Sequence, residues 1–418
     1  MLLGIVLIVL ALLGAPLFAI IAAGALVSFI AQDPAQGVVV LIEIFSIAEM
    51  PILLAIPLFT FAGYILSESQ APDRLVRLTR AVLGWMPGGL AIVCIGASAF
   101  FTAFTGASGV TIIALGAILY PALAQSGYHE KFNLGLVTAG GSLGLLFAPS
   151  LPLILYGVVA GVNIDKLFVA GVLPGMLMLA ALSIYSLWVN RHTRIPLAHF
   201  SWREVGSAIV DSIWELPLPV VVLGGIYSGL LAVSEAAAVT AVYVVLVEVV
   251  IRREISLAKL PDIMRESMVL VGGILLILGA SLASTNYVID AEIPQRLMGI
   301  VSDYVDGRIS FLFLLLLFLL VLGAFLDIFS ALVLVVPLIL PVAAQFGVDP
   351  VHLGIIFLAA MQLGYLTPPV GLNLFIASYR FDKSIIHVYL ATFPFLLILF
   401  AAVMVITFWP GLSLVLLD

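Results

Sequence analysis

The stretch Leu363-Gly-Tyr-Leu-Thr-Pro-Pro-Val-Gly-Leu-Asn373 lies inside an apolar run long enough to cross a bilayer. It nevertheless carries two adjacent prolines, two glycines, a threonine and an asparagine. Proline lacks an N–H and clashes with the preceding turn, so the helix must break here. At bilayer depth, broken backbone is tolerated only where it is buried in protein or lines a watery cavity. The stretch therefore predicts a binding site built from helix ends near the membrane midplane.

The composition indicates an all-α polytopic membrane protein. Of the 418 residues, 64% are hydrophobic and only 9% are charged; ordinary soluble domains carry about 25% charged residues. Several apolar runs exceed the roughly 20 residues that a spanning helix needs, and they lack the alternation of a membrane β-barrel. No hydrophilic segment is long enough for a soluble domain. We therefore expect ligand capture or ATP hydrolysis, if either occurs, in the membrane core or on another polypeptide.

Two apolar runs, about 90–123 and about 309–344, are too long for single straight spans. At 1.5 Å per residue, about 34 residues in one helix would measure ~50 Å. Each run has a break near its middle, at Thr105-Gly-Ala-Ser-Gly-Val-Thr111 and at Gly323-Ala-Phe-Leu-Asp-Ile-Phe-Ser330. The runs predict two re-entrant hairpins. Two further spans, about 132–160 and about 352–378, are predicted to be broken helices.

Prolines, glycines and one glutamine of the chain recur at a spacing of 220 residues. Adding 220 relates six pairs of like residues: Pro121 and Pro341, Gln125 and Gln345, Gly127 and Gly347, Gly144 and Gly364, Pro149 and Pro369, Pro174 and Pro394. The spacing predicts two repeats, 1–206 and 207–418. Each repeat would hold scaffold helices, one hairpin and one broken helix.

The basic residues predict that the two repeats are inverted. If both hairpins return to their own side, 13 of the 16 Lys and Arg residues fall on one side. These are Arg74, Arg77, Arg80, Lys131, Arg191, Arg194, Arg203, Arg252, Arg253, Lys259, Arg265, Arg380 and Lys383, against Lys166, Arg296 and Arg308 on the other. The richer side is expected to be cytoplasmic. Inverted repeats with broken helices are typical of secondary transporters. The pattern leaves open whether residues 1–31 cross once or twice.

Residues 72–82 predict an amphipathic helix in the membrane interface. Arg74, Arg77 and Arg80 recur three apart, while Leu75, Leu78 and Val82 lie on another face. We expect the basic side of this helix to face the lipid headgroups.

The hairpin turns and helix breaks supply the candidate site, because inverted-repeat transporters bind substrate and ions at the repeat interface. Half-helix N-termini favour an anion, and freed carbonyl and hydroxyl oxygens suit Na⁺. The candidate substrate residues are Thr105, Gly106, Ser108, Ser150, Thr367, Pro369, Gly371 and Asn373. The candidate Na⁺ ligands are Thr105, Ser108, Thr111, Pro149, Asp327, Ser330, Thr367 and Gly371.

Asp327 is the one ionisable residue deep in an apolar run. A carboxylate at such depth is costly and usually functional. It is either a Na⁺ ligand or the N-cap of the second half-helix, and both roles stay open. No Lys or Arg lies near the turns and breaks in the sequence. A carboxylate substrate would therefore be neutralised by helix ends and bound cations, which favours Na⁺ symport. Each Na⁺ descending ~100 mV supplies about 2.3 kcal/mol, so we expect two or more.

With these features the chain resembles the large membrane subunit of tripartite ATP-independent periplasmic (TRAP) transporters, of the ion-transporter superfamily. The motifs that carry the resemblance are Ala55-Ile-Pro-Leu-Phe59, Ala62-Gly63, Thr105–Thr111, Gly127-Tyr128, Ala148-Pro-Ser150, Leu173-Pro-Gly175, Ser234-Glu-Ala-Ala237, Asp327, Gly347-Val-Asp349 and Thr367–Gly371. The resemblance implies a Na⁺-driven elevator-type transporter for small organic acids, with no enzymatic activity and no organic cofactor. It implies two partners, a small four-helix membrane subunit and a periplasmic substrate-binding protein, and no nucleic acid. The implied location is the lipid bilayer of a bacterial or archaeal cytoplasmic membrane.

Two departures from the family pattern leave the Na⁺ sites of the first half open. Thr105 and Ala107 replace two residues of a tip that is usually rich in Ser and Gly, and the first break reads Ala148-Pro-Ser150 instead of Pro-Pro-Ser.

Two other functions compete with this interpretation. A binding-protein-independent Na⁺/carboxylate symporter of the same superfamily would show the same architecture. Gly106-Ala-Ser-Gly109 also fits the G-x-S-G of rhomboid-type intramembrane serine proteases. That chemistry needs a histidine base beside the serine. No histidine lies inside a downstream span, and His352 lies only at the start of one.

Overall fold

The computed structural model describes residues 6–417 except 8, 11–14, 87, 192–199, 294, 297–298, 300–304 and 306. All regular structure in these residues is helical. By length and apolar composition, eight of the described helices could cross a membrane, or nine if the bent pair Glu130–Leu146 and Leu151–Ala160 counts as one span. The prediction of an all-α polytopic membrane protein is confirmed.

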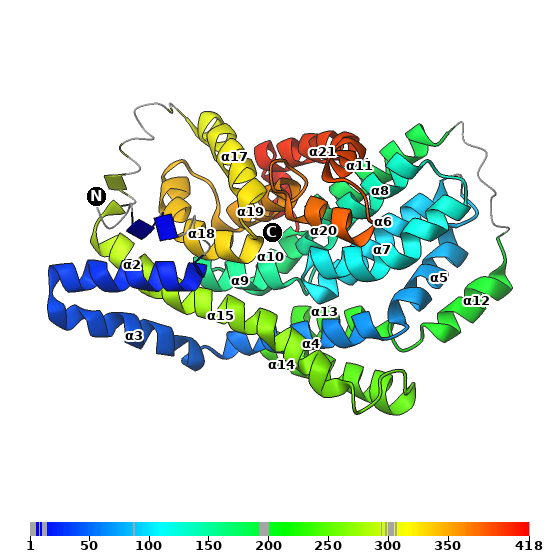
Figure 1. Ribbon diagram of the computed structural model, residues 1–418, viewed down its shortest axis with the longest axis horizontal. Helices are drawn as coiled ribbons and strands as arrows, with labels where there is room; N and C mark the ends of the chain where they lie inside the picture. Colours follow the sequence, from blue (N-terminus) through cyan, green and yellow to red (C-terminus); the bar gives the residue numbers. More distant parts are fainter. Residues whose placement is uncertain are drawn as a thin grey trace.

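An outer layer of helices runs along one side of the molecule (Figure 1). The long helix α15 packs against α2, α3 and α4, and α4 also packs against α14. Their bounds are α2 (Leu17–Gln32), α3 (Gly37–Ser46), α4 (Ala55–Glu68), α14 (Val233–Val245) and α15 (Leu260–Asp290). Whether residues 1–31 cross the membrane once or twice stays a prediction, because residues 1–5, 8 and 11–14 lie outside the described part. The described part of this stretch consists of residues 6, 7, 9, 10, 15 and 16 and the helix α2.

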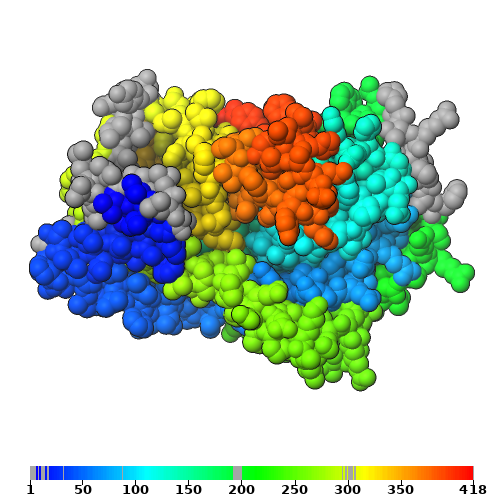
Figure 2. All heavy atoms as spheres, in the orientation of Figure 1, coloured from blue at the N-terminus to red at the C-terminus, as the bar shows by residue number. Residues whose placement is uncertain are grey.

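The inner helices stand against this layer in two matched sets. The first is α6 (Gly89–Thr105), α7 (Ser108–Gln125), α8 (Glu130–Gly140), α9 (Leu151–Ala160), α10 (Ile164–Ala170) and α11 (Val172–Val189). The second is α17 (Arg308–Phe325), α18 (Ile328–Gln345), α19 (Pro350–Gly364), α20 (Leu372–Arg380), α21 (Ile385–Phe408) and the short α22 (Gly411–Leu414). Adding 220 to the bounds of α7 gives those of α18. On the face in Figure 2, the orange and red C-terminal segment lies against the cyan one, and α20 packs on α7 and α21 on α8.

Both overlong runs are broken where the sequence predicted. α6 ends at Gly106, whose φ of 65° is left-handed, and α7 begins after the extended Ala107. α17 ends before the extended pair Leu326 and Asp327, and α18 follows. The prediction of two half-length helices in each run is confirmed. Their re-entrance with respect to a bilayer stays a prediction.

Both predicted broken helices are present. The second break runs from Tyr365 to Gly371, as the prolines require. The first is longer than predicted: α8 already ends at Gly140, and a 3-10 turn over Leu143–Leu146 precedes the break at Pro149. The bonds Ala148–Pro149 and Pro368–Pro369 are both cis.

Three elements outside the candidate site depart from a plain spanning helix. The helix α13 (Pro217–Tyr227) has only 11 residues, about 16 Å at 1.5 Å per residue, and is too short to cross a bilayer. α14 continues into a π-helix, η5 (Leu246–Ile251). α15 has 31 residues and begins inside the basic stretch Arg252–Arg265.

The predicted interfacial helix forms as α5 (Ala71–Leu83), but its basic side does not wholly face headgroups. Arg74 is buried, and its guanidinium binds Glu215, Glu248 and Glu254. At the surface, Arg77 pairs with Asp211, the last residue of α12 (Trp202–Asp211). The expectation was wrong for Arg74 because the period of three in the sequence does not reveal acidic partners that lie far away in the chain.

Candidate functional site

The turn of the first hairpin is held by glycine contacts. A Cβ on Gly106 would lie 2.5–2.8 Å from the side chain of Leu151, the first residue of α9. A Cβ on Gly63 of α4 would lie 2.8 Å from the backbone of Phe104 and Thr105. Real Cβ atoms do not approach so closely, so the turn needs glycine at both positions. The first hairpin turn is therefore packed against the first helix break.

The same turn reaches the second half of the chain. The Ser108 hydroxyl donates a 2.7 Å hydrogen bond to the side-chain oxygen of Asn373, and both residues are buried. Asn373 lies in α20, directly after the second break. Its amide nitrogen has no hydrogen-bond partner in the part of the chain that the structure describes. The structure thus joins two candidate residues and leaves a buried donor between them.

A buried group of oxygens lies behind the first turn, around Thr102. The Thr102 hydroxyl lies 2.8 Å from the carbonyl oxygens of Ser98 and Gly141, and 2.7 Å from the hydroxyl of Thr111. Two hydroxyl protons cannot serve all these oxygens at once, because a hydroxyl donates one hydrogen bond. Of this group only Thr111 was a sequence candidate. Thr102 was missed because a single threonine in an apolar helix looks like an ordinary helix residue.

Two hydrogen bonds join the second turn to the second break. The Gly371 N–H donates to the Ala324 carbonyl at 3.1 Å, and the Ile328 N–H donates to the Tyr365 hydroxyl at 2.7 Å. Gly323 of α17 and Gly364 of α19 approach so closely that a Cβ on Gly364 would lie 2.5 Å from the Gly323 Cα. Each hairpin turn is thus packed on the helix break of its own half.

Asp327 caps α18. One carboxylate oxygen accepts the N–H groups of Phe329 and Ser330, each at 3.0 Å, and the other accepts the Ser330 hydroxyl. The side chain is only partly buried. The N-cap role is therefore present, and the role as Na⁺ ligand stays a prediction. Among the described residues, no hydrogen bond joins Asp327 or Ser330 to the first hairpin.

The remaining candidates differ in what their polar atoms do. The Ser150 hydroxyl is buried and has no hydrogen-bond partner among the described residues. The Thr367 hydroxyl donates to the Leu363 carbonyl at 3.0 Å. The Pro369 carbonyl already accepts the Tyr389 hydroxyl at 2.6 Å. Ser150 therefore offers a free polar atom, whereas Thr367 and Pro369 are already engaged.

Four half-helices begin at the candidate residues: α7 at Ser108, α9 after Ser150, α18 after Asp327 and α20 after Gly371. A helix N-terminus carries unpaired N–H groups and a partial positive charge, which favour an anion. None of the hydrogen bonds and ion pairs described for these candidates involves Lys or Arg. The arrangement can hold a small anion and hard cations without a buried basic side chain.

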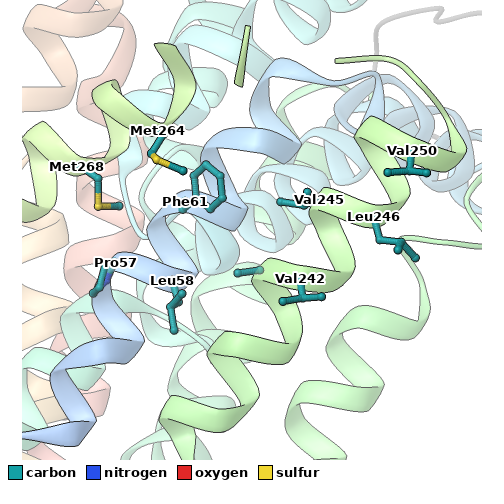
Figure 3. A pocket seen from close by; sticks show the side chains of 10 residues that line it. Pro57, Leu58, Phe61, Val242, Val245, Leu246, Val250, Met264 and Met268 are labelled. Carbon is teal, nitrogen blue, oxygen red and sulfur yellow. The ribbon is translucent and has the colours of Figure 1, made fainter. Parts of the chain in front are cut away.

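A separate apolar groove lies away from this site. It encloses about 520 Å³ between α4, α14 and α15. Figure 3 shows the side chains of Phe61 and Met264 next to each other in its wall. Its other lining residues are Pro57, Leu58, Ala241, Val242, Val245, Leu246, Val250 and Met268. Such walls offer an anion no hydrogen bond, so this groove is not the candidate site.

Comparison with known proteins identifies the family. A family model described as "Tripartite ATP-independent periplasmic transporter, DctM component" matches residues 4–412. The chain belongs to this family. It is 34% identical over 376 residues to the C4-dicarboxylate TRAP transporter large permease protein DctM of Pseudomonas aeruginosa, covering 90% of this chain and 88% of that one.

Two further similarities bear on length and fold. The chain is 33% identical over 407 residues to the isethionate TRAP transporter permease protein DctMQ of Oleidesulfovibrio alaskensis, covering 96% of this chain but only 62% of that relative. The crystal structure of the Alcanivorax borkumensis YdaH transporter aligns with a TM-score of 0.62 at 12% identity, covering 86% of this chain and 84% of that one. The latter likeness concerns the fold alone.

Membership of the TRAP family makes the chain a transporter permease subunit and not an enzyme. The protease alternative also lacks its geometry, because the hydroxyl of Ser108 is bonded to Asn373 and not to a histidine. His352 lies buried between Ser413 and the Thr407 carbonyl, at 3.2 and 3.3 Å.

Proposed function

We propose that the chain carries a small organic acid across the cytoplasmic membrane of a bacterium or archaeon, driven by Na⁺. The observation that carries the proposal is the Ser108–Asn373 contact, which brings the N-termini of α7 and α20 together beside a buried amide nitrogen that has no described partner. The two relatives are named for a C4-dicarboxylate and for isethionate. Both are small organic anions, which is the ligand class that helix N-termini favour.

The coupling ions would bind where acceptor oxygens exceed the available protons. In the first half this is the group formed by Thr102, Thr111 and the Gly141 carbonyl. The other candidates of the first half are Thr105, Ser108 and Pro149. In the second half the candidates are Asp327, Ser330, Thr367 and Gly371. Uncharged oxygens and one carboxylate suit Na⁺ better than a transition metal, which prefers nitrogen or sulfur ligands.

The proposed mechanism is an elevator built from two inverted repeats, 1–206 and 207–418. The recurrence of helix bounds at 220 residues supports the repeats. The cross-packing of α9 with α18 and of α20 with α7 supports movement of both hairpins and both breaks as one body. In that mechanism the outer layer of α2, α3, α4, α14 and α15 would stay fixed in the membrane.

The proposal includes two partner proteins, as the word tripartite in the family description supports. A periplasmic substrate-binding protein would deliver the organic acid, and a small four-helix membrane subunit would attach to the outer layer. A symporter that works without a binding protein is the competing transporter.

Uptake by cells tests the substrate class. The chain is co-expressed with the binding protein and small subunit of its own genome, and uptake of a panel of labelled compounds is measured with and without Na⁺. We expect Na⁺-dependent entry of a carboxylate. Entry of neutral sugars alone would contradict the organic-acid proposal. In that case Asn373 would not bind an organic acid, and Asn373→Ala would leave uptake unchanged.

A further inference from the structure

A buried cluster of charged residues outside the candidate site surrounds Arg74 of α5. The guanidinium donates from Nε to Glu215 at 2.7 Å, lies 3.3 Å from Glu248, and also binds Glu254. The side chains of Arg74, Glu215 and Glu248 are 9%, 3% and 1% exposed, and that of Glu254 is 13% exposed. One buried cation therefore faces three carboxyl groups.

The three carboxyl groups come from different parts of the chain. Glu215 lies between α12 and α13, Glu248 lies within the π-helix η5, and Glu254 lies in the loop after it. π-Helical turns occur often at functional sites. α5 packs against α12, α6 and α7. The cluster thus fastens the helix that leads into the first hairpin to the outer helices.

Charge balance excludes three ionised carboxylates here. With one guanidinium they would leave two uncompensated negative charges in a buried space, at a cost of several kcal/mol per ion. Glu248 and Glu254 bind neighbouring nitrogens of the same guanidinium, Nη2 and Nη1, so their carboxyl groups are neighbours. Each of two neighbouring carboxylates disfavours the ionised form of the other. One oxygen of Glu215 is also buried, with no partner among the described residues.

We propose that this cluster is a proton-binding site in which Glu248 holds a proton and donates it in a hydrogen bond to Glu254. Burial by itself raises the pKa of the Glu254 carboxyl, but hydrogen bonds from Arg74 and from the Gln70 N–H outweigh it and lower that pKa. Glu254 is therefore the ionised partner. Glu248 is fully buried, and its distances of 3.3–3.4 Å to Arg74 are longer than those of the other two carboxyl groups. Arg74 therefore stabilises the ionised form of Glu248 least, and Glu248 keeps the proton.

The other groups near Glu248 do not replace this proton. Tyr243 directs its hydroxyl to the Trp214 carbonyl. Arg252 donates to the Asp211 carbonyl. The carboxylate of Asp211 pairs with Arg77 at the surface. Among the described contacts, Arg74 is therefore the one cation that binds the three carboxyl groups. The buried Nε of Arg252 also has no described partner.

If Glu248 holds this proton, the free energy of unfolding is expected to fall as pH rises. An unfolded chain releases carboxyl protons above about pH 5, because an ordinary Glu titrates near 4.3. The folded chain would keep the Glu248 proton at neutral pH and bind more protons than the unfolded chain, which lowers stability with rising pH. Loss of this proton would loosen α5 from the outer helices.

Infrared spectroscopy and thermal unfolding of the full-length protein test the site. We expect a protonated-carboxyl C=O band at pH 6 that disappears in Glu248→Gln. We also expect the Tm of the wild type to fall by a few degrees between pH 5 and pH 8. Glu248→Gln keeps the hydrogen bond to Glu254 without a titrating proton, so its Tm would lose this slope.

Two further variants sharpen the test. Glu254→Gln replaces the ionised acceptor of this proton by a neutral amide that can donate, so Glu248 would ionise and the band would vanish even if Glu248→Gln failed to fold. Glu68→Gln removes an exposed carboxylate that pairs with Lys259 outside the cluster, and would keep the band and the slope. A band that survives in Glu248→Gln, or is absent from the wild type, would overturn the proposal. So would a Tm that responds to Na⁺ or K⁺ but not to pH.

Discussion

The hydroxyl of Ser108 lies 2.7 Å from the side-chain oxygen of Asn373, although the two residues are 265 positions apart in the chain. This bond joins the turn of the first hairpin to the helix that follows the second break. The Ser108–Asn373 pair is therefore a direct hydrogen bond between candidate residues of the two halves.

The first prediction concerns the energy of this link. Ser108→Ala and Asn373→Ala each remove a buried hydrogen bond, and each is expected to lower the free energy of unfolding by about 1–3 kcal/mol. A double-mutant cycle, measured by thermal unfolding, should give a coupling energy of about 0.5–3 kcal/mol. Ser126→Ala is the control, because the Ser126 hydroxyl bonds only within its own helix. Additive effects for Ser108 and Asn373 would contradict the link.

The second prediction concerns the oxygen group around Thr102. Thr102→Val keeps the shape of the side chain but removes the hydroxyl that faces Gly141 and Thr111. Weakening one ligand of a Na⁺ site should raise the Na⁺ concentration needed for half-maximal uptake by roughly tenfold, for a loss of ~1.4 kcal/mol. The measurement is uptake against Na⁺ concentration.

Thr240→Val serves as the control for Thr102. Thr240 is equally buried, but its hydroxyl bonds only to Ala236 in its own helix. Equal Na⁺ curves for the two variants would remove Thr102 from the proposed Na⁺ site.

The third prediction separates the two roles of Asp327. Asn also accepts N–H groups at a helix N-cap, so Asp327→Asn should change stability by only a few tenths of a kcal/mol, whereas Asp327→Ala should cost about 1 kcal/mol. If the carboxylate also binds Na⁺, Asp327→Asn will weaken Na⁺ activation of uptake while the protein stays folded. Unchanged Na⁺ activation in Asp327→Asn would reduce Asp327 to a helix cap.

The fourth prediction concerns the contact between α17 and α19. Gly364→Ala places a Cβ 2.5 Å from the Gly323 backbone, and backbone cannot move aside as a side-chain tip can. We expect a loss of about 1–3 kcal/mol in stability, as for other overpacked sites. Gly272→Ala is the control, because nothing lies within 4 Å of its added Cβ. Thermal unfolding of both variants measures the difference, and equal Tm values would refute the close contact.

The helix breaks were predictable from the sequence because they depend on local chemistry. Prolines and glycines at Thr367–Gly371 act on their own backbone, so their effect does not need a partner. The same holds for Gly106 and for Asp327, whose cap lies within three residues. The two overlong runs were recognised by length alone.

The contacts of the site could not be predicted, because they join distant residues. Nothing near Ser108 indicates Asn373, and nothing near Arg74 indicates Glu215 or Glu248. The period of three in α5 suggested a solvated basic face, yet Arg74 is buried among three carboxyl groups. Tertiary pairing overrode the local pattern at that position.

Uptake by proteoliposomes tests the central claim most directly. The chain is reconstituted with its small membrane subunit, and uptake of the labelled organic acid is measured with an imposed inward Na⁺ gradient, without the gradient, and with and without the binding protein. The account predicts accumulation only when the Na⁺ gradient and the binding protein are both present. Accumulation that ignores the Na⁺ gradient would contradict Na⁺ coupling. Full-rate accumulation without the binding protein would instead identify a binding-protein-independent symporter.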